Sequence, residues 1–225
     1  MIELRRVSFA YPQRPVLTEV SAVLAEQRIG IVGGNGSGKS TLARLINGLV
    51  RPTGGQVLVD GLDTHRDLKQ VRRRVGFVFQ DPDLQIVMPT VAEDLAFSLR
   101  PRKLPADQVR QRVEQTLAAY GLQEHADHPA HLLSGGQKQL LALAAVLITE
   151  PAIMVLDEPT TLLDLRNRRA VMRVVAGLPQ QVVLVTHDLD VLADFDRVLV
   201  IDEGRIVADD TPGPALAAYR RLAEV

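Results

Sequence analysis

A glycine-rich stretch near the start of the chain has the residue types and the spacing of a phosphate-binding loop. It runs from Gly33 to Thr41 and matches the pattern G-x-x-x-x-G-K-[ST] at every fixed position. Glycines let a backbone curl so that several N–H groups point at one anion. Lys39 supplies a mobile cation for the outer phosphates of a nucleotide, and the Ser40 hydroxyl suits a magnesium ion. The loop residues expected to contact a nucleotide are Gly33, Asn35, Gly36, Ser37, Gly38, Lys39, Ser40 and Thr41.

The residues on either side place this loop between a strand and a helix, where its chemistry requires it. Residues 28–32 read as a short buried strand. The helix that begins near Gly38 would add the positive end of its dipole to the site. One face of that helix is apolar and carries Leu42, Leu45, Ile46 and Leu49. A glycine-rich turn that matches the pattern by chance would not need these flanks.

Two adjacent carboxylates follow a buried strand in the second half of the chain. The strand covers 153–156, and Asp157 and Glu158 come directly after it. In a chain that binds a triphosphate, Asp157 would hold magnesium, and Glu158 would orient or deprotonate the attacking water. Many strands end in an acid, so the pair becomes a specific signal only together with the phosphate loop.

A second potential anion site lies at Ser134, Gly135, Gly136 and Gln137, which open an apolar helix that runs to Ile148. Ser134 is a good N-cap, and the glycines leave backbone N–H groups uncovered. The N-terminus of a helix attracts anions through such groups. Because this helix is apolar all round, we expect it to be buried.

Tyr11 and His187 each have a functional interpretation beside a plain structural one. Tyr11 either stacks on an adenine ring or closes the end of a strand, and its spacing alone favours the second. His187 follows the buried strand 182–185, at the edge of an open α/β sheet where ligands bind. It would either contact a terminal phosphate or occupy a turn.

Three histidines recur at every third position, which suggests a metal site. They are His125, His128 and His131. Pro129 breaks any helix that would align them on one ion, so we interpret them as part of a surface loop.

Residues 81–89 form a polar loop with an apolar centre, Leu84, Ile86, Val87 and Met88. Thr90 and Glu93 then form a capping box that starts a helix. Exposing such an apolar cluster gains a protein little, so we expect it to line a groove for a partner. The alternative is that it covers the core of the neighbouring helices.

The elements around these residues indicate an α/β chain with a helical insertion. Residues 2–9 and 16–24 read as two strands of an antiparallel edge sheet. The stretch 81–148 reads as purely helical and interrupts a chain of alternating strands and helices. We therefore expect a single domain, with a core at about 1–80 and 149–225 and a helical subdomain at about 81–148.

Composition excludes several classes of protein. The net charge is −1, so the chain lacks the overall basic field that holds nucleic acid. It contains no cysteine, which excludes disulfides and cysteine-based zinc sites. Its longest wholly apolar run, 140–148, is shorter than the ~20 residues that cross a bilayer. The first residues lack the apolar centre of a signal peptide.

The order of these motifs resembles that of the ABC-type ATPases over essentially the whole chain. The motifs are the phosphate loop, Gln80, Leu-Ser-Gly-Gly-Gln at 133–137, Asp157 with Glu158, and His187. The resemblance implies a P-loop NTPase core of the α/β class with an antiparallel β edge sheet and an inserted helical subdomain. It also implies ATP and Mg²⁺ as ligands, and two subunits that sandwich two ATP molecules head to tail.

The same resemblance implies roles for single residues. Tyr11 is similar to the aromatic residue that stacks on adenine, which reverses the preference based on spacing. Gln80 resembles the glutamine that contacts magnesium and senses the membrane partner. Ser134, Gly135, Gly136 and Gln137 resemble the signature that binds the nucleotide of the second subunit. Glu158 resembles the catalytic base and His187 the switch histidine.

One position departs from the family pattern. After the Asp-Glu-Pro-Thr stretch the family has Ser-Ala/Gly-Leu-Asp, whereas this chain has Thr161, Leu162, Leu163 and Asp164. A leucine in place of a small residue would crowd a loop thought to communicate between the two sites.

Residues 79–87 and 89–97 are similar to the ATPases of energy-coupling-factor (ECF) transporters. Within that group, residues 28–33 and 159–167 most resemble the biotin-type ATPases. Those transporters import vitamins and cobalt or nickel. The resemblance implies a transmembrane coupling protein and a substrate-binding membrane subunit as partners, and a peripheral place on the cytoplasmic face of the membrane. The sequence does not identify the solute or decide between a homodimer and a heterodimer.

Four other functions use related nucleotide chemistry. A soluble mechanical ATPase on DNA would carry a long coiled coil between Lys39 and Asp157, and no heptad run lies there. A ribosomal ATPase would carry two such domains in tandem. A guanine-nucleotide switch would need Asn-Lys-x-Asp, which this chain lacks. The ATPase of a different ABC importer stays as an alternative.

Overall fold

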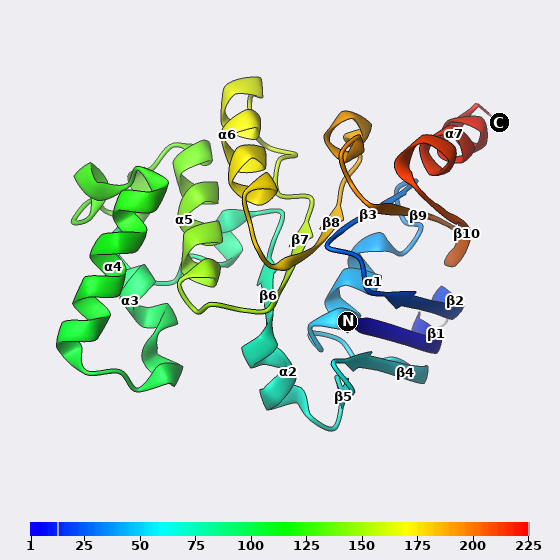
Figure 1. Cartoon of the computed structure of the whole chain (residues 1–225), viewed down its shortest axis with the longest axis horizontal. Helices are drawn as coiled ribbons and strands as arrows, with labels where there is room; N and C mark the ends of the chain where they lie inside the picture. Colours follow the sequence, from blue (N-terminus) through cyan, green and yellow to red (C-terminus); the bar gives the residue numbers. More distant parts are fainter. Residues whose placement is uncertain (13, 225) are drawn as a thin grey trace. The chain divides into compact units, whose positions relative to one another are not determined.

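The computed structural model describes residues 1–12 and 14–224, and these divide into two compact units. The first unit comprises 1–75, 152–158 and 179–225. The second comprises 76–151 and 159–178. Figure 1 labels the α-helices and β-strands in chain order.

An antiparallel sheet forms part of the first unit. Its strands lie in the order β2-β1-β4-β5. They span Ile2–Tyr11 (β1), Arg14–Leu24 (β2), Gly54–Val59 (β4) and Leu62–Asp63 (β5). Alternate residues of β1 are buried at Ile2 and Leu4, as expected for a sheet with one face against a core. The predicted edge sheet is confirmed.

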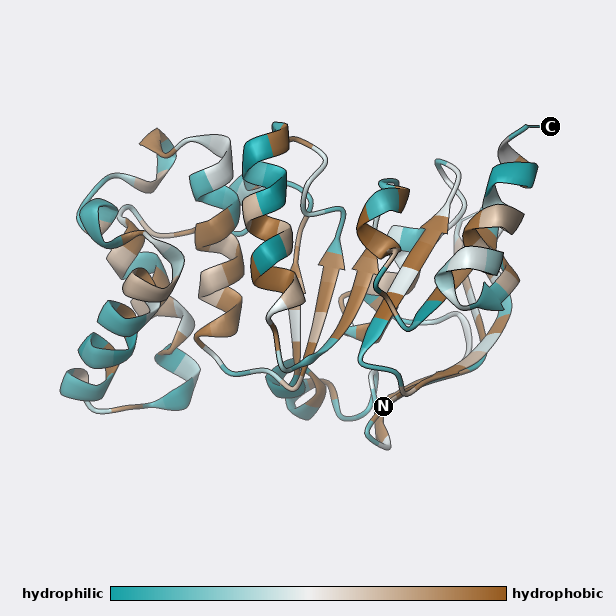
Figure 2. Ribbon diagram, turned by 45° about the horizontal axis from the view of Figure 1, so that its top comes forward, coloured by the Kyte–Doolittle hydropathy of each residue, from teal (hydrophilic) through white to brown (hydrophobic). Residues whose placement is uncertain are grey.

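A mostly parallel sheet forms the centre of the first unit. The strands of this sheet that lie wholly in the first unit follow the order β10-β9-β3-β8-β7. They span Arg28–Gly33 (β3), Ile153–Asp157 (β7), Gln181–Val185 (β8), Arg197–Asp202 (β9) and Arg205–Asp210 (β10). Strands β3, β7 and β8 are almost wholly buried, as parallel strands covered on both faces must be. Figure 2 shows this as hydrophobic colouring along the central strands.

The register of this sheet brings distant parts of the chain to one edge. Val185 at the end of β8 is paired with Ile31 of β3 on one side and with Asp157 of β7 on the other. Because the three strands run parallel, the loops that follow them leave the same edge. The phosphate loop after β3 and Glu158 after β7 are therefore neighbours.

Three α-helices complete the first unit, α1 (Lys39–Ile46), α2 (Leu68–Arg74) and α7 (Pro212–Ala223), together with the 3₁₀ turn η5 (Leu189–Leu192). The predicted apolar face of α1 is buried at Leu42, Leu45 and Ile46. Leu49 was expected on the same face, but it is exposed because α1 ends at Ile46.

The second unit is mainly helical. The chain enters it through β6 (Val75–Val78), whose last three residues belong to this unit. Its α-helices are α3 (Val91–Ser98), α4 (Ala106–Tyr120), α5 (Gly135–Leu147) and α6 (Leu165–Ala176). Single 3₁₀ turns lie at Pro82–Leu84 (η1), Arg100–Arg102 (η2), Gln123–His125 (η3) and Ala130–Leu132 (η4). By its contacts α6 belongs to this unit, although the expected helical subdomain, 81–148, did not include it.

The helices α3, α4 and α5 share one apolar core, in which Leu95, Leu117 and Leu141 are almost fully buried. The predicted capping box is present at Thr90 before α3, and the predicted N-cap Ser134 forms a capping box with Gln137 before α5. No helix in the described part of the chain is both long and apolar enough to span a membrane.

Candidate active site

The phosphate loop follows a path that only glycine can take at two positions. At Gly38, with φ of 109°, a Cβ atom would lie 2.7 Å from Leu17 Cδ2 and 2.9 Å from the Val16 carbonyl oxygen. At Gly33 a Cβ atom would lie 2.1 Å from the Ile201 carbonyl oxygen. Strands β2 and β9 therefore pack directly against the loop backbone and fix its shape.

The Lys39 ammonium is buried and held by the loop itself. Nζ donates to the carbonyl oxygens of Gly33 (2.9 Å) and Gly34 (2.8 Å). Burial lowers the pKa of Lys39, while Glu158 and Asp157 act to raise it. Among the described residues no side chain caps the N-terminus of α1, so its first N–H groups are available to an anion.

Ser40 of the loop and Asp157 at the end of β7 form a hydrogen-bonded pair of oxygen-bearing side chains. Ser40 Oγ donates to Asp157 Oδ1 at 2.8 Å, and Arg44 Nη2 lies 3.7 Å from Asp157 Oδ2. Burial raises the pKa of Asp157, although the hydrogen bond from Ser40 and the charges of Arg44 and Lys39 oppose the shift. A hydroxyl and a carboxylate that already touch are the ligand types that Mg²⁺ prefers, so these residues fit the ion.

Glu158 lies next to this pair in a backbone conformation that is unusual for glutamate. Its φ is 51°, in the left-handed region, and its N–H donates to the Val185 carbonyl oxygen at 2.9 Å. Its Oε2 atom lies 3.1 Å from His187 Nδ1, and the His187 side chain is 57% exposed. Such backbone strain is concentrated at functional sites, where the surrounding structure holds a side chain in one orientation.

Tyr11 lies beside the phosphate loop, where it could both close the end of a strand and stack on an adenine ring. Its ring is half exposed and meets Phe9 edge-on, with centroids 5.1 Å apart, so it does close the end of β1. It also lines a hollow of about 210 Å³ against the loop. The lining residues are Tyr11, Arg14, Val16, Gly36, Gly38, Lys39, Ser40 and Thr41.

Two arginines of this site were missed by the sequence reasoning. Arg14 lines the same hollow, and a Cβ atom at Gly36 would lie 3.6 Å from its Nη2. No sequence signal marked it, because its position depends on how β2 crosses the loop. Arg44 could have been found, since it lies four residues after Ser40 on the same helix and therefore on the same face.

The signature segment in the second unit has the predicted cap geometry. Ser134 Oγ accepts from Gln137 N–H, and Gln137 Oε1 accepts from Ser134 N–H at 2.9 Å. A Cβ atom at Gly136 would lie 2.3 Å from the Asn167 side chain, whereas one at Gly135 meets only Leu163 Cδ2, at 3.9 Å. The expected buried helix follows in α5.

Gln80 lies in the second unit and is exposed. With Gly135, Leu162 and other residues of that unit it lines a hollow of about 160 Å³. Leu162 is 69% exposed, so within this chain it does not crowd its own loop as the departure from the family pattern had suggested.

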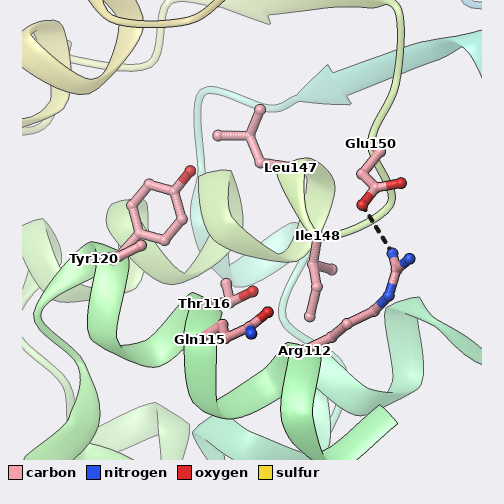
Figure 3. A pocket seen from close by; sticks show the side chains of 8 residues that line it. Arg112, Gln115, Thr116, Tyr120, Leu147, Ile148 and Glu150 are labelled. Carbon is pink, nitrogen blue, oxygen red and sulfur yellow. Dashed lines mark hydrogen bonds and ion pairs between the residues drawn. The ribbon is translucent and has the colours of Figure 1, made fainter. Parts of the chain in front are cut away.

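A further hollow of the second unit, of about 250 Å³, lies between α4 and the end of α5 (Figure 3). Arg112 and Glu150 form an ion pair at its rim, 2.9 Å apart, and burial raises the pKa of the Tyr120 hydroxyl. It contains none of the predicted site residues.

The first unit thus brings together the phosphate loop, Asp157, Glu158 and His187 at one edge of the parallel sheet, and Tyr11 lies beside the loop at the end of β1. Gln80 and the residues Ser134 to Gln137 belong to the second unit. Their contacts with a nucleotide or a metal ion stay predictions.

Comparisons with known proteins agree with this geometry. Residues 19–161 match the model of the ABC transporter family. A protein of Deinococcus radiodurans, named provisionally as an ABC transporter ATP-binding protein, is 60% identical over 98% of this chain and 97% of its own length. The biotin transport ATP-binding protein BioM of Rhizobium etli is 47% identical over 99% of both chains.

Solved structures show the same fold. CbiO1 of Clostridium perfringens, described as part of the transporter complex CbiONQ, matches with a TM-score of 0.85 and 32% identity over 100% of this chain and 93% of its own. The ATP-binding cassette MJ0796, solved as a dimer with ADP and phosphate, matches with a TM-score of 0.84 and 29% identity over 94% of this chain and 99% of its own. The chain therefore belongs to the ABC transporter family, as one of its ATP-hydrolysing ATP-binding subunits.

Proposed function

We propose that this subunit energises an ECF-type importer, with biotin as the favoured solute and another vitamin or a transition-metal ion as the alternatives. The observation that carries the ATPase chemistry is the meeting of the phosphate loop, Asp157 and Glu158 at one sheet edge. The likeness to BioM along its full length supports the choice of biotin.

The proposed roles follow from the contacts at this edge. Lys39 and the N–H groups of α1 hold the phosphates, and the Tyr11 ring stacks on the adenine ring. Ser40 and Asp157 hold Mg²⁺, which would neutralise charge on the phosphates when bound. Glu158 takes the proton of the attacking water.

His187 would orient the catalytic carboxylate. Its Nδ1 is within hydrogen-bonding distance of Glu158, so a neutral imidazole that carries its proton there donates to the carboxylate. Its exposed remainder is free to contact the terminal phosphate. We propose Gln80 as a further contact of the Mg²⁺ ion.

A second ATPase subunit would complete the site. The capping box leaves Ser134 and the backbone of Gly135 and Gly136 at the open end of α5, where an anion is favoured. We propose that these residues and Gln137 bind the nucleotide of a second, identical subunit. The dimeric cassette MJ0796, to which this chain is similar, supports the arrangement.

The membrane partner would dock on the loop 81–89. Leu84 and Val87 are 72% and 60% exposed, which leaves two apolar side chains in water. The buried Asp94 carboxylate holds this loop in place, since it accepts from the N–H groups of Val87 (2.9 Å) and Met88 (3.0 Å). Ile86 instead packs against the core of α3, α4 and α5.

We propose that Leu84 and Val87 receive a helix of a transmembrane coupling protein, in the helix-in-groove manner. A membrane subunit that binds the solute would complete the importer, and nucleic acid is not a partner. The ATPase would then be peripheral, at the cytoplasmic face of the membrane.

The first prediction separates binding from chemistry. Lys39→Ala should weaken ATP binding as well as hydrolysis, because the lysine stabilises bound phosphate. Glu158→Gln should keep ATP binding but slow hydrolysis by about two orders of magnitude or more, the scale for loss of a positioned base. Calorimetric titration and single-turnover hydrolysis measure the two effects. A Glu158→Gln protein that turns over at the wild-type rate would show that Glu158 is not the base.

The second prediction tests the two-subunit site. Glu158→Gln protein should dimerise on addition of ATP and Mg²⁺, and Gly135→Asp in that background should prevent it by repelling the γ-phosphate. The isolated chain should tolerate this change, because a Cβ atom at Gly135 meets only Leu163. Gly136→Ala is the contrasting variant and should lower Tm, because it collides with Asn167.

Light scattering decides this test, with thermal unfolding as the check on folding. ATP-driven dimers of the Gly135→Asp variant would contradict the proposed contact.

The third prediction tests docking. Val87→Glu should leave folding and ATP binding unchanged but abolish co-purification with membrane subunits and solute uptake by cells. Ile86→Glu should lower Tm, because its side chain packs on the helical core. Val23→Glu, at a 52% exposed position of β2, is the matched control and should dock normally.

Normal uptake with Val87→Glu would rule out the docking loop. A wild-type chain that retains no membrane protein on purification would rule out transport and favour a soluble mechanical ATPase.

A further inference from the structure

The side chain that closes the cap of α5 is also bonded to a pair of histidines. Gln137 Nε2 lies 2.7 Å from His125 Nε2, and His125 Nδ1 lies 2.9 Å from His128 Nδ1. The two imidazole rings are tilted against each other with centroids 5.0 Å apart. A hydrogen-bonded row therefore runs from Ser134 through Gln137 and His125 to His128.

The direction of each hydrogen bond in this row is fixed by its first member. Ser134 N–H is a donor, so the atom of Gln137 that faces it must be the amide oxygen. The Gln137 NH₂ group then faces His125, whose Nε2 must accept. Neutral His125 carries its proton on Nδ1 and donates it to His128.

Protonation of His125 is incompatible with this row. An imidazolium carries N–H on both nitrogens, so its Nε2 would face the Gln137 NH₂ group donor to donor. Turning the amide would relieve that contact but would set NH₂ against Ser134 N–H. In the first case the bond between Gln137 and His125 is lost, and in the second the bond from Ser134 N–H that closes the cap is lost.

The charged groups on the adjoining segments are engaged elsewhere or flank the pair. Lys138 on α5 pairs with Asp83, and Glu93 on α3 bonds to Thr90. Glu124, Asp127 and His131 lie on the loop that carries the two histidines, which begins after α4 ends at Tyr120. His125 is half-buried and His128 exposed, so protons reach the pair from solvent.

The loop that carries the histidines does not depend on them for its path. Ala92 N–H donates to the Ala126 carbonyl oxygen (2.9 Å), and Val91 N–H donates to that of His128 (3.3 Å). Ala126 packs against the helical core. A change of the His125 side chain should therefore alter Gln137 without unfolding the segment.

We propose that His125 is a positioning residue for ATP hydrolysis. In its neutral form it holds the Gln137 amide in the orientation that completes the cap, so that the signature backbone is ordered before a second subunit's nucleotide arrives. Protonation of His125 would release the amide and weaken the two-subunit site. This inference rests on the proposed role of residues 134–137.

The test compares ATP-driven dimerisation in the Glu158→Gln background at about pH 8 and about pH 5.5, a range in which histidines as a class change charge. His125→Leu, which offers no acceptor, should weaken dimerisation about fivefold at pH 8, the scale for one hydrogen bond. His125→Gln offers an oxygen to the Gln137 amide but does not titrate, so it should restore dimerisation.

At about pH 5.5 the dimerisation affinity of the Glu158→Gln protein should fall by about the same factor relative to that of the His125→Gln variant in the same background. Only a protonated His125 lacks an acceptor for the Gln137 amide. The other histidines, His187 included, are common to both proteins and cancel in this ratio. His128→Leu should have the smaller effect, since it leaves His125 Nε2 as an acceptor.

Two results would overturn the inference. One is an unchanged affinity in His125→Leu at pH 8 with the same Tm as the parent. The other is an equal acid sensitivity of the parent and His125→Gln. Failure of the Glu158→Gln parent to dimerise at any pH would instead remove the two-subunit site itself.

A nitrogen NMR spectrum of the nucleotide-free protein is an independent readout. It should show His125 protonated at Nδ1 and unprotonated at Nε2 near pH 8, and the opposite tautomer would contradict the inference even if no dimer forms.

Discussion

The burial of unlike charges at one edge of a parallel sheet is the constraint on which the rest of the site depends. Burial lowers the pKa of Lys39 and raises that of Asp157, so each side chain is charged at a cost in free energy. Part of that cost is offset within the protein. Two carbonyl oxygens of the loop accept from Lys39, and the Ser40 hydroxyl and the Arg44 guanidinium stabilise Asp157. Nucleotide phosphates and Mg²⁺ carry the charges that would offset the remainder, so ligand binding and the free energy of folding are coupled.

The loop geometry serves the same end. Glycine at positions 33 and 38 lets β9 and β2 pack onto the loop backbone, and this holds its N–H groups in place before a ligand arrives. The strained backbone at Glu158 likewise fixes a carboxylate beside Ser40 and Asp157. Preorganised groups of this kind need not rearrange during the reaction, which is how electrostatic stabilisation becomes effective.

Features that depend on short-range spacing were predictable from the sequence. The phosphate loop, the acids Asp157 and Glu158 at the end of β7, the capping box at Thr90 and the N-cap at Ser134 each involve residues at most a few positions apart. The α/β class followed from the alternation of buried strands and amphipathic helices. These patterns also carried the family resemblance, which the comparisons confirm.

Features that depend on the meeting of distant segments were not predictable. Arg14 reaches the loop only because β2 crosses it, and Ile86 turns into the core while its neighbour Val87 faces solvent. The sequence indicated only that His125 and His128 lie in a surface loop, whereas the fold brings His125 within hydrogen-bonding distance of Gln137. Two adjacent residues of one apolar run cannot be assigned to opposite environments from their types alone.

The thermal stability of Asp157→Asn tests the central claim most directly. A raised pKa means that the charged carboxylate destabilises the nucleotide-free protein, and this effect vanishes as the pH falls and Asp157 is protonated. Asp157→Asn should therefore raise Tm near pH 8, with a gain that shrinks in acid, and should lose the further rise in Tm that Mg²⁺ gives wild-type protein with ATP. In a chain of this size ~1 kcal/mol moves Tm by about 2–4 °C, which calorimetry resolves. A lower Tm for Asp157→Asn near pH 8, or an undiminished response to Mg²⁺, would contradict the account.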